Sequence, residues 1–203
     1  MTINELPEVI KHIWINRIKE DFDEKMILNE DTLKSLFYYH LRLNLSELIL
    51  EDNIRIFTEF TVQNKKIADL AIVNITVTHD IIDIVEVLAL LEFKYKKTKN
   101  PLKYIDGFSN SSIKPFHSDL LKLKGYGDFD NRTLLFGAFI SEFNYPEKFN
   151  TWMEDIEHFF DENVLLRMNE LVGIIDDKTG EFKTFIEPSE NIITKKRGNI
   201  KNI

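Results

Sequence analysis

The sequence predicts an α/β protein with a mixed central sheet flanked by helices. Hydrophobic residues follow a helical spacing up to about residue 50, and the period changes to two from residue 54. The segment 82–95 is almost continuously apolar, which is typical of a central strand buried on both faces. Further helical and strand patterns then alternate, so the expected order is α-α-β-β-β-α-β-α-β-β. Three strands form a meander, and a helix then crosses over to the next strand.

Two helices are expected before the sheet. The first covers residues 6–19 and has Pro7 in its first turn, where the missing N–H costs nothing. The second begins at an N-cap, either Asn29 or Asp31, and runs to about Leu50. Both helices carry an apolar stripe, so we expect them to flank the sheet.

The first three strands are expected at 54–62, 66–75 and 82–95. Strict alternation in the first strand places Ile54, Ile56, Thr58, Phe60 and Val62 on one face and Arg55, Phe57, Glu59 and Thr61 on the other. The same rule places Asp69 beside Ala71 and Val73 in the second strand. Thr- and Asn-containing residues around 74–80 would connect the second and third strands as a hairpin.

The second half of the chain alternates between the two patterns. We expect a loop at 100–114, a helix from Pro115 to Lys124 stopped by Gly125, a strand at 133–140, a helix at 145–160, and a hairpin formed by 170–176 and 181–186. No linker divides the chain. The sequence therefore predicts one domain over residues 1–188 and a basic, flexible tail over 189–203.

Composition excludes several functional classes. The chain has 203 residues, of which 43% are hydrophobic, and it contains no Cys, so disulfide frameworks, thiolate metal sites and cysteine nucleophiles are ruled out. The N-terminus lacks the pattern of a signal peptide. The longest apolar stretch, 81–93, is short and interrupted by acids, so we expect a cytoplasmic protein without a membrane partner.

Charge is unevenly distributed along the chain. The net charge of −8 argues against general binding of nucleic acid. Between Lys94 and Lys124, however, eight lysines stand against only two aspartates. This basic tract is a local electrostatic feature inside an acidic protein, and it is suited to an anionic partner.

Two acids lie in strands that are otherwise apolar. Asp69 is in IADLAIV and Glu92 is in VLALLEFKY, and buried carboxylates are rare unless they are paired or bind a metal. Glu59 is a third acid in a neighbouring strand. If the three strands are adjacent, these carboxylates can converge, and oxygen ligands select a hard cation such as Mg²⁺ or Mn²⁺. The alternative is that Asp69 is a salt-bridged core acid and that Glu92 and Lys94 form a solvated pair.

These residues together resemble the PD-(D/E)xK nuclease superfamily, which has the restriction-endonuclease-like fold. The matching residues are Asp69 in KIADLAIV and Glu92-Phe93-Lys94 in LLEFKY, followed by a helix that includes SDLLKL. Glu30, on the same helical stripe as Leu33, corresponds to the acid of the N-terminal helix. The likeness covers roughly residues 30–140, and Ala68 stands where the name-giving proline would be.

The resemblance implies an αβββαβ core, here with an extra N-terminal helix and a C-terminal helix plus hairpin. It also implies a Mg²⁺-dependent nuclease, with Mn²⁺ as a substitute metal, that hydrolyses DNA phosphodiester bonds. Asp69, Glu92 and the carbonyl of Phe93 would hold the metal, Lys94 would activate water, and Glu30 or Glu59 would complete the site. Restriction and phage defence are typical settings for such enzymes.

The basic tract would then hold the nucleic-acid backbone beside the site, through Lys96, Lys97, Lys99, Lys103, Lys114, Lys122 and Lys124. DNA and RNA are both compatible with such contacts. A homodimer or a protein partner would help to cut two strands. The competing hypothesis is a non-catalytic interaction or regulatory module on the same fold, with an apolar surface on the helix at 145–160.

Overall fold

The structure is a computed structural model. It describes residues 3–51, 53–62, 66–78, 81–96, 122, 125, 132–142, 167–176 and 179–188. Within these residues, no helix is both long and apolar enough to cross a membrane. The predicted loop at 100–114, the predicted helix at 145–160 and the tail at 189–203 lie outside this part of the chain.

A six-stranded mixed sheet forms the centre of the molecule, with its strands in sequence order from β1 to β6. The strands are β1 (Ile54–Thr61), β2 (Ile67–Thr78), β3 (Ile81–Lys96), β4 (Leu134–Ser141), β5 (Met168–Ile175) and β6 (Phe182–Pro188). The first three form an antiparallel meander, and β4 runs parallel to β3. Parallel neighbours need a crossover connection, so the predicted meander and crossover are both confirmed.

The far half of the sheet repeats the parallel arrangement once. Strand β5 runs parallel to β4, and β6 returns antiparallel to β5. The predicted β5–β6 hairpin is therefore confirmed. Its turn is closed by Gly180, whose N–H bonds the carbonyl of Asp176 at 2.7 Å and whose φ of +70° suits glycine.

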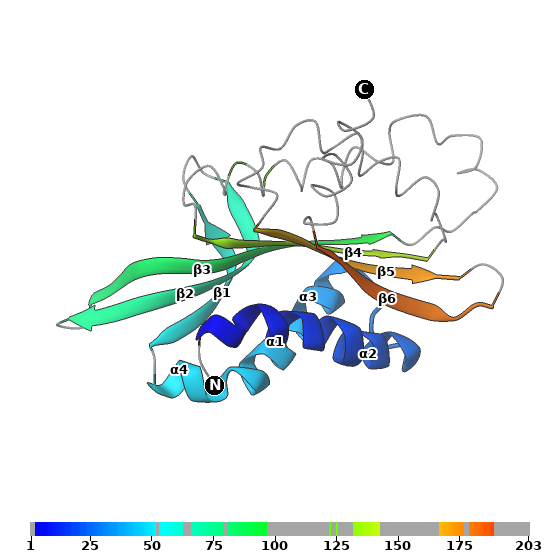
Figure 1. Cartoon of the computed structure of the whole chain (residues 1–203), viewed down its shortest axis with the longest axis horizontal. Helices are drawn as coiled ribbons and strands as arrows, with labels where there is room; N and C mark the ends of the chain where they lie inside the picture. The colour runs from blue at the N-terminus through cyan, green and yellow to red at the C-terminus, as the bar shows by residue number, and fades with distance from the viewer. Residues whose placement is uncertain are drawn as a thin grey trace, which may run out of the picture.

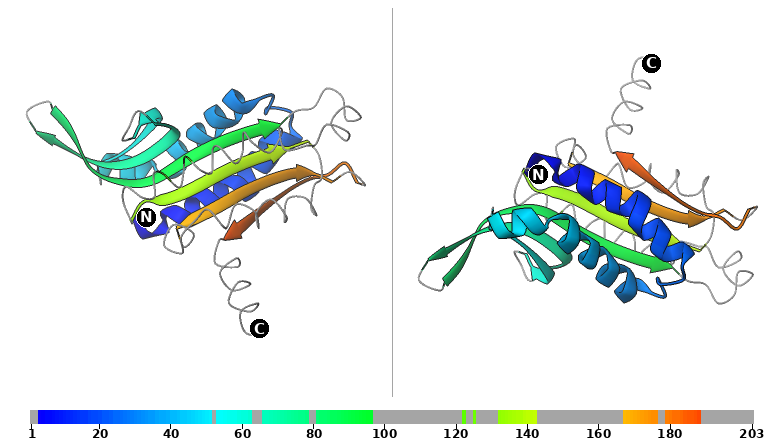
Figure 2. Two further views of the ribbon diagram at one scale, coloured as in Figure 1. Left: turned by 90° about the horizontal axis from the view of Figure 1, so that it is seen from above. Right: turned by 90° about the horizontal axis from the view of Figure 1, so that it is seen from below.

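The helices that the structure describes before β1 lie on one face of the sheet (Figures 1 and 2). They are η1 (Ile3–Glu5), α1 (Leu6–His12), η2 (Ile13–Ile18), α2 (Lys19–Asp23), α3 (Glu30–Asn44) and α4 (Ser46–Glu51). The first predicted helix is thus longer than expected. It continues through the π-helical segment η2 to Asp23, and η2 places Trp14 in the core with its indole N–H donating to the carbonyl of Val172, 3.1 Å away.

The second predicted helix is divided in two at Leu45. Asn29 is its N-cap, as one of the two expected alternatives, and it forms a capping box with Thr32. The prediction of a single helix up to Leu50 was wrong, because the chain turns at Leu45 and continues as α4. Leu45 and Leu48 are both buried, so the turn keeps the apolar side of both helices against the sheet.

The sheet has an apolar layer on each face. The larger layer lies between the sheet and the helices and includes Trp14, Phe37 and Phe93. The second layer lies on the opposite face and includes Leu90 and Val172. Strands β3, β4 and β5 contribute to both layers, so the prediction that 82–95 contains a centrally buried strand is confirmed for its second half.

The faces predicted for β1 were partly wrong. Ile54 and Ile56 pack in the helix-side layer as expected, but Phe60 and Val62 pack with Phe57 in the opposite layer. The alternation is interrupted at Glu59, whose φ of +53° is in the left-handed region. A single residue in that conformation reverses the faces of all residues that follow it in the strand.

Between residues 97 and 131 the structure places two residues, and both are helical. They are Lys122 and Gly125, so Gly125 does not stop the predicted helix as expected. A side chain at position 125 would collide with the ammonium end of Lys66. That ammonium is the far end of a flexible side chain, which could move aside at little cost, so this contact does not explain the glycine.

Candidate active site

The candidate site begins where β2 separates from β3. The ladder between these strands includes the pair Leu70 and Leu91, and one further step in the same register places Asp69 opposite Glu92. At this point the backbone N–H of Phe93 donates to Oδ2 of Asp69, at 2.7 Å. The Asp69 side chain therefore replaces a backbone acceptor at the end of the ladder, and this fixes its carboxylate between the two strands.

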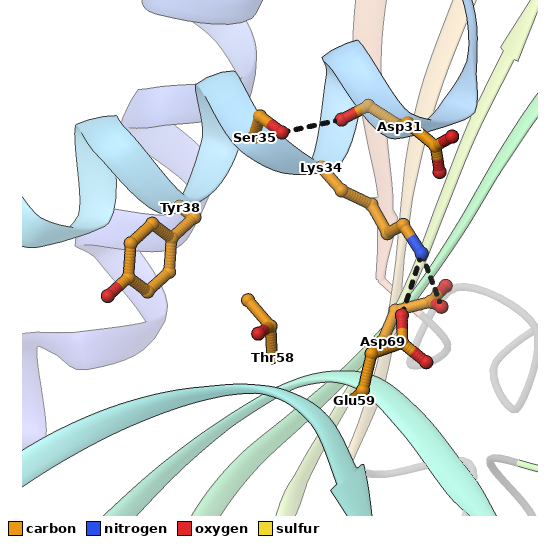
Figure 3. Close-up of a pocket in the computed structure, with 7 residues that line it drawn as sticks. All are labelled: Asp31, Lys34, Ser35, Tyr38, Thr58, Glu59 and Asp69. Atoms are coloured by element: carbon orange, nitrogen blue, oxygen red, sulfur yellow. Dashed lines mark hydrogen bonds and ion pairs between the residues drawn. The ribbon is translucent and has the colours of Figure 1, made fainter.

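The other oxygen of Asp69 contacts a lysine from the helical layer. Nζ of Lys34 in α3 lies 3.2 Å from Oδ1 of Asp69 and 3.0 Å from Oε1 of Glu59 (Figure 3). The prediction that Asp69 shares the face of Ala71 and Val73 was wrong. Ala68 and Ala71 both pack in the layer away from the helices, so the alternation is interrupted between them and Asp69 can meet Lys34.

Lys34 is a charged group in partly buried surroundings. Burial by itself lowers the pKa of its ammonium group, but the hydrogen bonds and negative charges of Glu59 and Asp69 outweigh that effect. The net result is a pKa well above the ordinary value for lysine. Lys34 therefore stays protonated over the whole range in which the protein is expected to work.

Glu59 reaches this cluster because of its unusual backbone. Its left-handed φ costs about 1–3 kcal/mol for a residue other than glycine, and such strain is concentrated at functional sites. A pocket of about 310 Å³ opens next to Glu59 between α3 and the first two strands (Figure 3). It is lined by Asp31, Lys34, Ser35, Tyr38, Thr58, Glu59 and Asp69.

Glu92 is almost completely buried. Its side chain is 3% exposed, and its Oε2 lies 3.3 Å from Nζ of Lys122. Leu90, two residues earlier, packs in the layer away from the helices, whereas Phe93 packs against Phe37 on the helix side. The expectation that Glu92 and Phe93 project from opposite faces is consistent with these contacts.

Lys94 meets the acid that the sequence placed on the N-terminal helix. Its Nζ lies 3.1 Å from Oε2 of Glu30, in the first turn of α3, and both side chains are partly exposed. The T-shaped contact of Phe37 with Phe93 holds α3 against β3 about two turns beyond Glu30. The packing of this helix thus positions both Glu30 and Lys34 near the end of the β2–β3 ladder.

One further acid, Glu170, is aligned with Glu92 across the sheet. Glu92 pairs with Gly137 of β4, and Gly137 pairs with Glu170 of β5. Glu170 is fully buried, and it is flanked in its strand by Met168 and Val172, which pack in the same layer as Leu90. Sequence reasoning placed Glu170 only at the start of a strand and missed its alignment with Glu92, because register between distant strands is not visible in the sequence.

The structure thus brings the predicted residues together as two groups. Asp69, Glu59 and Lys34 form one group, Glu30 and Lys94 form another, and Glu92 contacts Lys122. Among the residues that can be placed, no three His, Asp or Glu side chains are close enough to share a metal ion.

The donors nevertheless fit Mg²⁺ in kind. This ion is usually held by one or two carboxylates together with water and substrate phosphates, rather than by a complete protein cage. One step beyond the last pair of the β2–β3 ladder, Asp69 is opposite Glu92 in the register. Asp69 contacts the Lys34 ammonium on the helix side, and Glu92 contacts the ammonium of Lys122. Carboxylates that already contact ammonium groups are also suited to bind a divalent cation. Phe93, next to Glu92 in β3, has a backbone carbonyl that could be a further oxygen ligand.

Most of the basic tract lies beyond the residues that can be placed. Lys97, Lys99, Lys103, Lys114 and Lys124 are outside the described ranges, and only the backbone of Lys96 is described, at the end of β3. Lys122 is half-exposed and reaches Glu92. One member of the predicted nucleic-acid-binding set is therefore beside the predicted metal ligand.

Lys34 was missed at the sequence level. A feature that could have identified it is its spacing, because residues four apart lie on the same face of a helix and Lys34 follows Glu30 by four positions. Any helix that presents Glu30 to the sheet therefore presents Lys34 nearby. Comparison of the chain with family models, curated proteins and solved structures finds no match.

Proposed function

We propose that this protein is a Mg²⁺-dependent nuclease that hydrolyses DNA phosphodiester bonds and has a restriction-endonuclease-like core. The observation that supports this best is the alignment at the end of the β2–β3 ladder. There Asp69 lies opposite Glu92, one step beyond the last ladder pair. Lys94 follows Glu92 by two residues in β3, and it contacts Glu30. Carboxylates that can hold a divalent cation, together with a lysine, are residue types that can support metal-dependent hydrolysis of a phosphodiester.

Each residue has a role in this proposal. Asp69, Glu92 and the carbonyl of Phe93 would hold Mg²⁺, and the bound ion would polarise the phosphate and lower the pKa of a coordinated water. The Lys94 ammonium orients the attacking water and stabilises negative charge as it develops. Glu30 holds Lys94 at 3.1 Å and thereby fixes the position of that ammonium.

The hydrolysis forms a bond between the water oxygen and phosphorus and breaks the bond from phosphorus to the leaving oxygen. One proton leaves the attacking water, and one is taken up by the leaving oxygen from solvent. Lys122 and the rest of the basic tract bind the phosphates of the strand, which makes affinity strongly dependent on salt. A dimer or a protein partner would supply the second cut in a duplex.

The test is cleavage of plasmid and single-stranded DNA with Mg²⁺, Mn²⁺ or EDTA. The proposal expects metal-dependent cutting that falls by about 100-fold or more in Glu92→Gln and in Lys94→Ala. Gln is chosen because it retains the volume of a side chain that is almost fully buried. Circular dichroism and melting temperature check that each variant is folded.

A matched control is available in the same strand. Glu86 in β3 is a partly exposed acid that pairs with Arg132, 3.4 Å away, and it lies well along the strand from Glu92. Glu86→Gln should retain full cleavage. Equal loss of activity in Glu86→Gln and Glu92→Gln, or full activity in EDTA, would contradict the proposal.

A second candidate function has its own supporting observation. The far end of the β2–β3 hairpin exposes five large aliphatic side chains, and exposed apolar patches often mark protein interfaces. They are Val77, Ile81, Ile82, Ile84 and Val85. A folded protein that neither cleaves nucleic acid nor binds Mn²⁺ in calorimetry would favour a non-catalytic interaction or regulatory module over the nuclease.

A further inference from the structure

Lys34 is a cation already placed among the acids of the candidate site. Its Nζ is shared between Oδ1 of Asp69 and Oε1 of Glu59, at 3.2 and 3.0 Å. Neither the basic tract nor the motif that carries the resemblance includes this lysine. An ammonium group that bridges two carboxylates occupies the kind of position that a divalent cation would occupy.

The position of Lys34 is fixed by the packing of its helix. The capping box of Asn29 and Thr32 sets the start of α3, and the ring of Phe37, one turn after Lys34, packs against Phe93. Phe93 is also the residue whose N–H binds Asp69. Lys34 and Asp69 are therefore held by the same small set of contacts, and their pairing is part of the fold.

The two carboxylates differ in how much they depend on Lys34. Asp69 has a side chain that is 16% exposed, so it is poorly solvated and needs a nearby cation. Glu59 is 62% exposed and is well solvated. If another cation binds Asp69, the Lys34 ammonium can leave Asp69 and keep its bond to Glu59. The strained backbone of Glu59 holds this second partner in place.

We propose that Lys34 is the resident counter-cation of Asp69, and that a divalent cation binding to Asp69 displaces the Lys34 ammonium onto Glu59. This inference rests on the proposed function, because it takes Asp69 as a metal ligand. Lys34 then has two effects. It stabilises the metal-free site by neutralising Asp69, and it weakens metal binding because it competes for the same oxygen.

The test is Mn²⁺ binding by calorimetry together with melting temperature in EDTA, for the full chain. Lys34→Met removes the ammonium and keeps an unbranched side chain. We expect it to bind Mn²⁺ at least about 10-fold more tightly than wild type. In EDTA its melting temperature should be lower, and saturating Mn²⁺ should raise it by more than it raises that of wild type.

Two further variants keep the test decisive. Lys34→Gln can still donate a hydrogen bond to Asp69 and serves if Lys34→Met does not fold, with the same expected direction for Mn²⁺ affinity. Lys11→Met is the matched control, because Lys11 also pairs with an exposed glutamate, Glu8 at 2.9 Å, but on α1. It should leave Mn²⁺ affinity unchanged.

The outcomes separate this inference from the proposed function. Mn²⁺ affinity that is unchanged or weaker without Lys34, in a protein that does bind Mn²⁺, overturns the competition and leaves the nuclease proposal intact. Binding that survives Asp69→Asn places the cation elsewhere and overturns the inference and the role proposed for Asp69. The absence of Mn²⁺ binding in both wild type and the Lys34 variants overturns the proposed function, and the inference with it.

Discussion

The two ends of the β2–β3 hairpin consist of the same two strands in different surroundings. At the inner end, β2 pairs with β1 and β3 pairs with β4, and residues from Ala89 to Phe93 are buried. At the outer end these neighbours are missing. The ladder between β1 and β2 stops at the pair Ile54 and Asn74, and the ladder between β3 and β4 starts only at the pair Ala89 and Leu134. The outer end is therefore a two-stranded ribbon, in which Ile81 is 63% exposed (Figure 2).

The comparison shows that neighbouring strands, rather than composition, decide what an apolar strand does. Both ends are rich in Ile, Val and Leu, and each has acidic residues. At the inner end the acids contact lysines that come from other elements, Lys34 and Lys122. At the outer end the aliphatic side chains are exposed. The inner end is suited to chemistry because its charges are held in fixed positions, and the outer end is suited to contact with another surface.

The largest expected difference between the two ends is in stability. Phe93→Ala removes a buried ring that packs on Phe37, and it should reduce the free energy of unfolding by about 3–5 kcal/mol. Urea denaturation of this variant and of Val85→Ala, at the exposed end, measures the contrast. Equal losses for both variants would show that the two ends do not differ in packing.

The second prediction concerns the polar contacts of the inner end. Asp69→Ala leaves the N–H of Phe93 without its acceptor and the Lys34 ammonium with Glu59 alone, so it should destabilise the fold by about 1–3 kcal/mol. Asp69→Asn keeps an oxygen for one of these donors and should cost less. Melting temperatures in EDTA test this order, and an Asn variant less stable than the Ala variant would contradict it.

A smaller effect is expected at alkaline pH. Tyr95, near the end of β3, has a raised pKa because of burial and because its hydroxyl donates to Oε1 of Glu142 at 2.7 Å. Since the folded state keeps this proton longer than the unfolded state, the stabilisation is complete below about pH 10 and is lost as the pH rises above it. Lys34 acts with the same sign.

Unfolding of wild type and Tyr95→Phe between pH 8 and pH 11.5 therefore checks this titration. Wild type should lose stability over the alkaline part of the range, and the variant should lose less. Parallel curves for the two proteins would show that Tyr95 titrates alike in the folded and unfolded chain. Ile84→Phe, at the exposed end, provides a control that introduces an aromatic ring without a titratable group.

The smallest effect is expected at the outer end. Ile82→Lys places a charge on a side chain that is already solvated, so the free energy of unfolding should change by no more than about 0.5 kcal/mol. A loss of 2 kcal/mol or more would mean that the ribbon is covered in solution. Sedimentation of wild type beside Ile82→Lys would then show whether a second copy covers it.

The sequence was sufficient to predict the order of the six strands, because periodicity and strand length follow directly from which faces are buried. It also made Asp69, Glu92 and Lys94 candidate site residues, since charged residues inside apolar strands are unusual. It could not locate the reversal at Glu59, because a left-handed φ in a residue other than glycine is imposed by tertiary contacts. It could not align Glu170 with Glu92 either, because that register depends on strands far apart in the chain.

The residues proposed to hold the metal and to activate water all lie between Glu30 and Lys94, and this has a consequence for synthesis. The antiparallel meander closes through local contacts, whereas β4 and β5 join the sheet only after long crossovers. On a growing chain, the meander is complete before β4 has been made. During that interval β3 is an edge strand with an apolar surface, so slow elongation beyond residue 96 should favour aggregation or capture by chaperones.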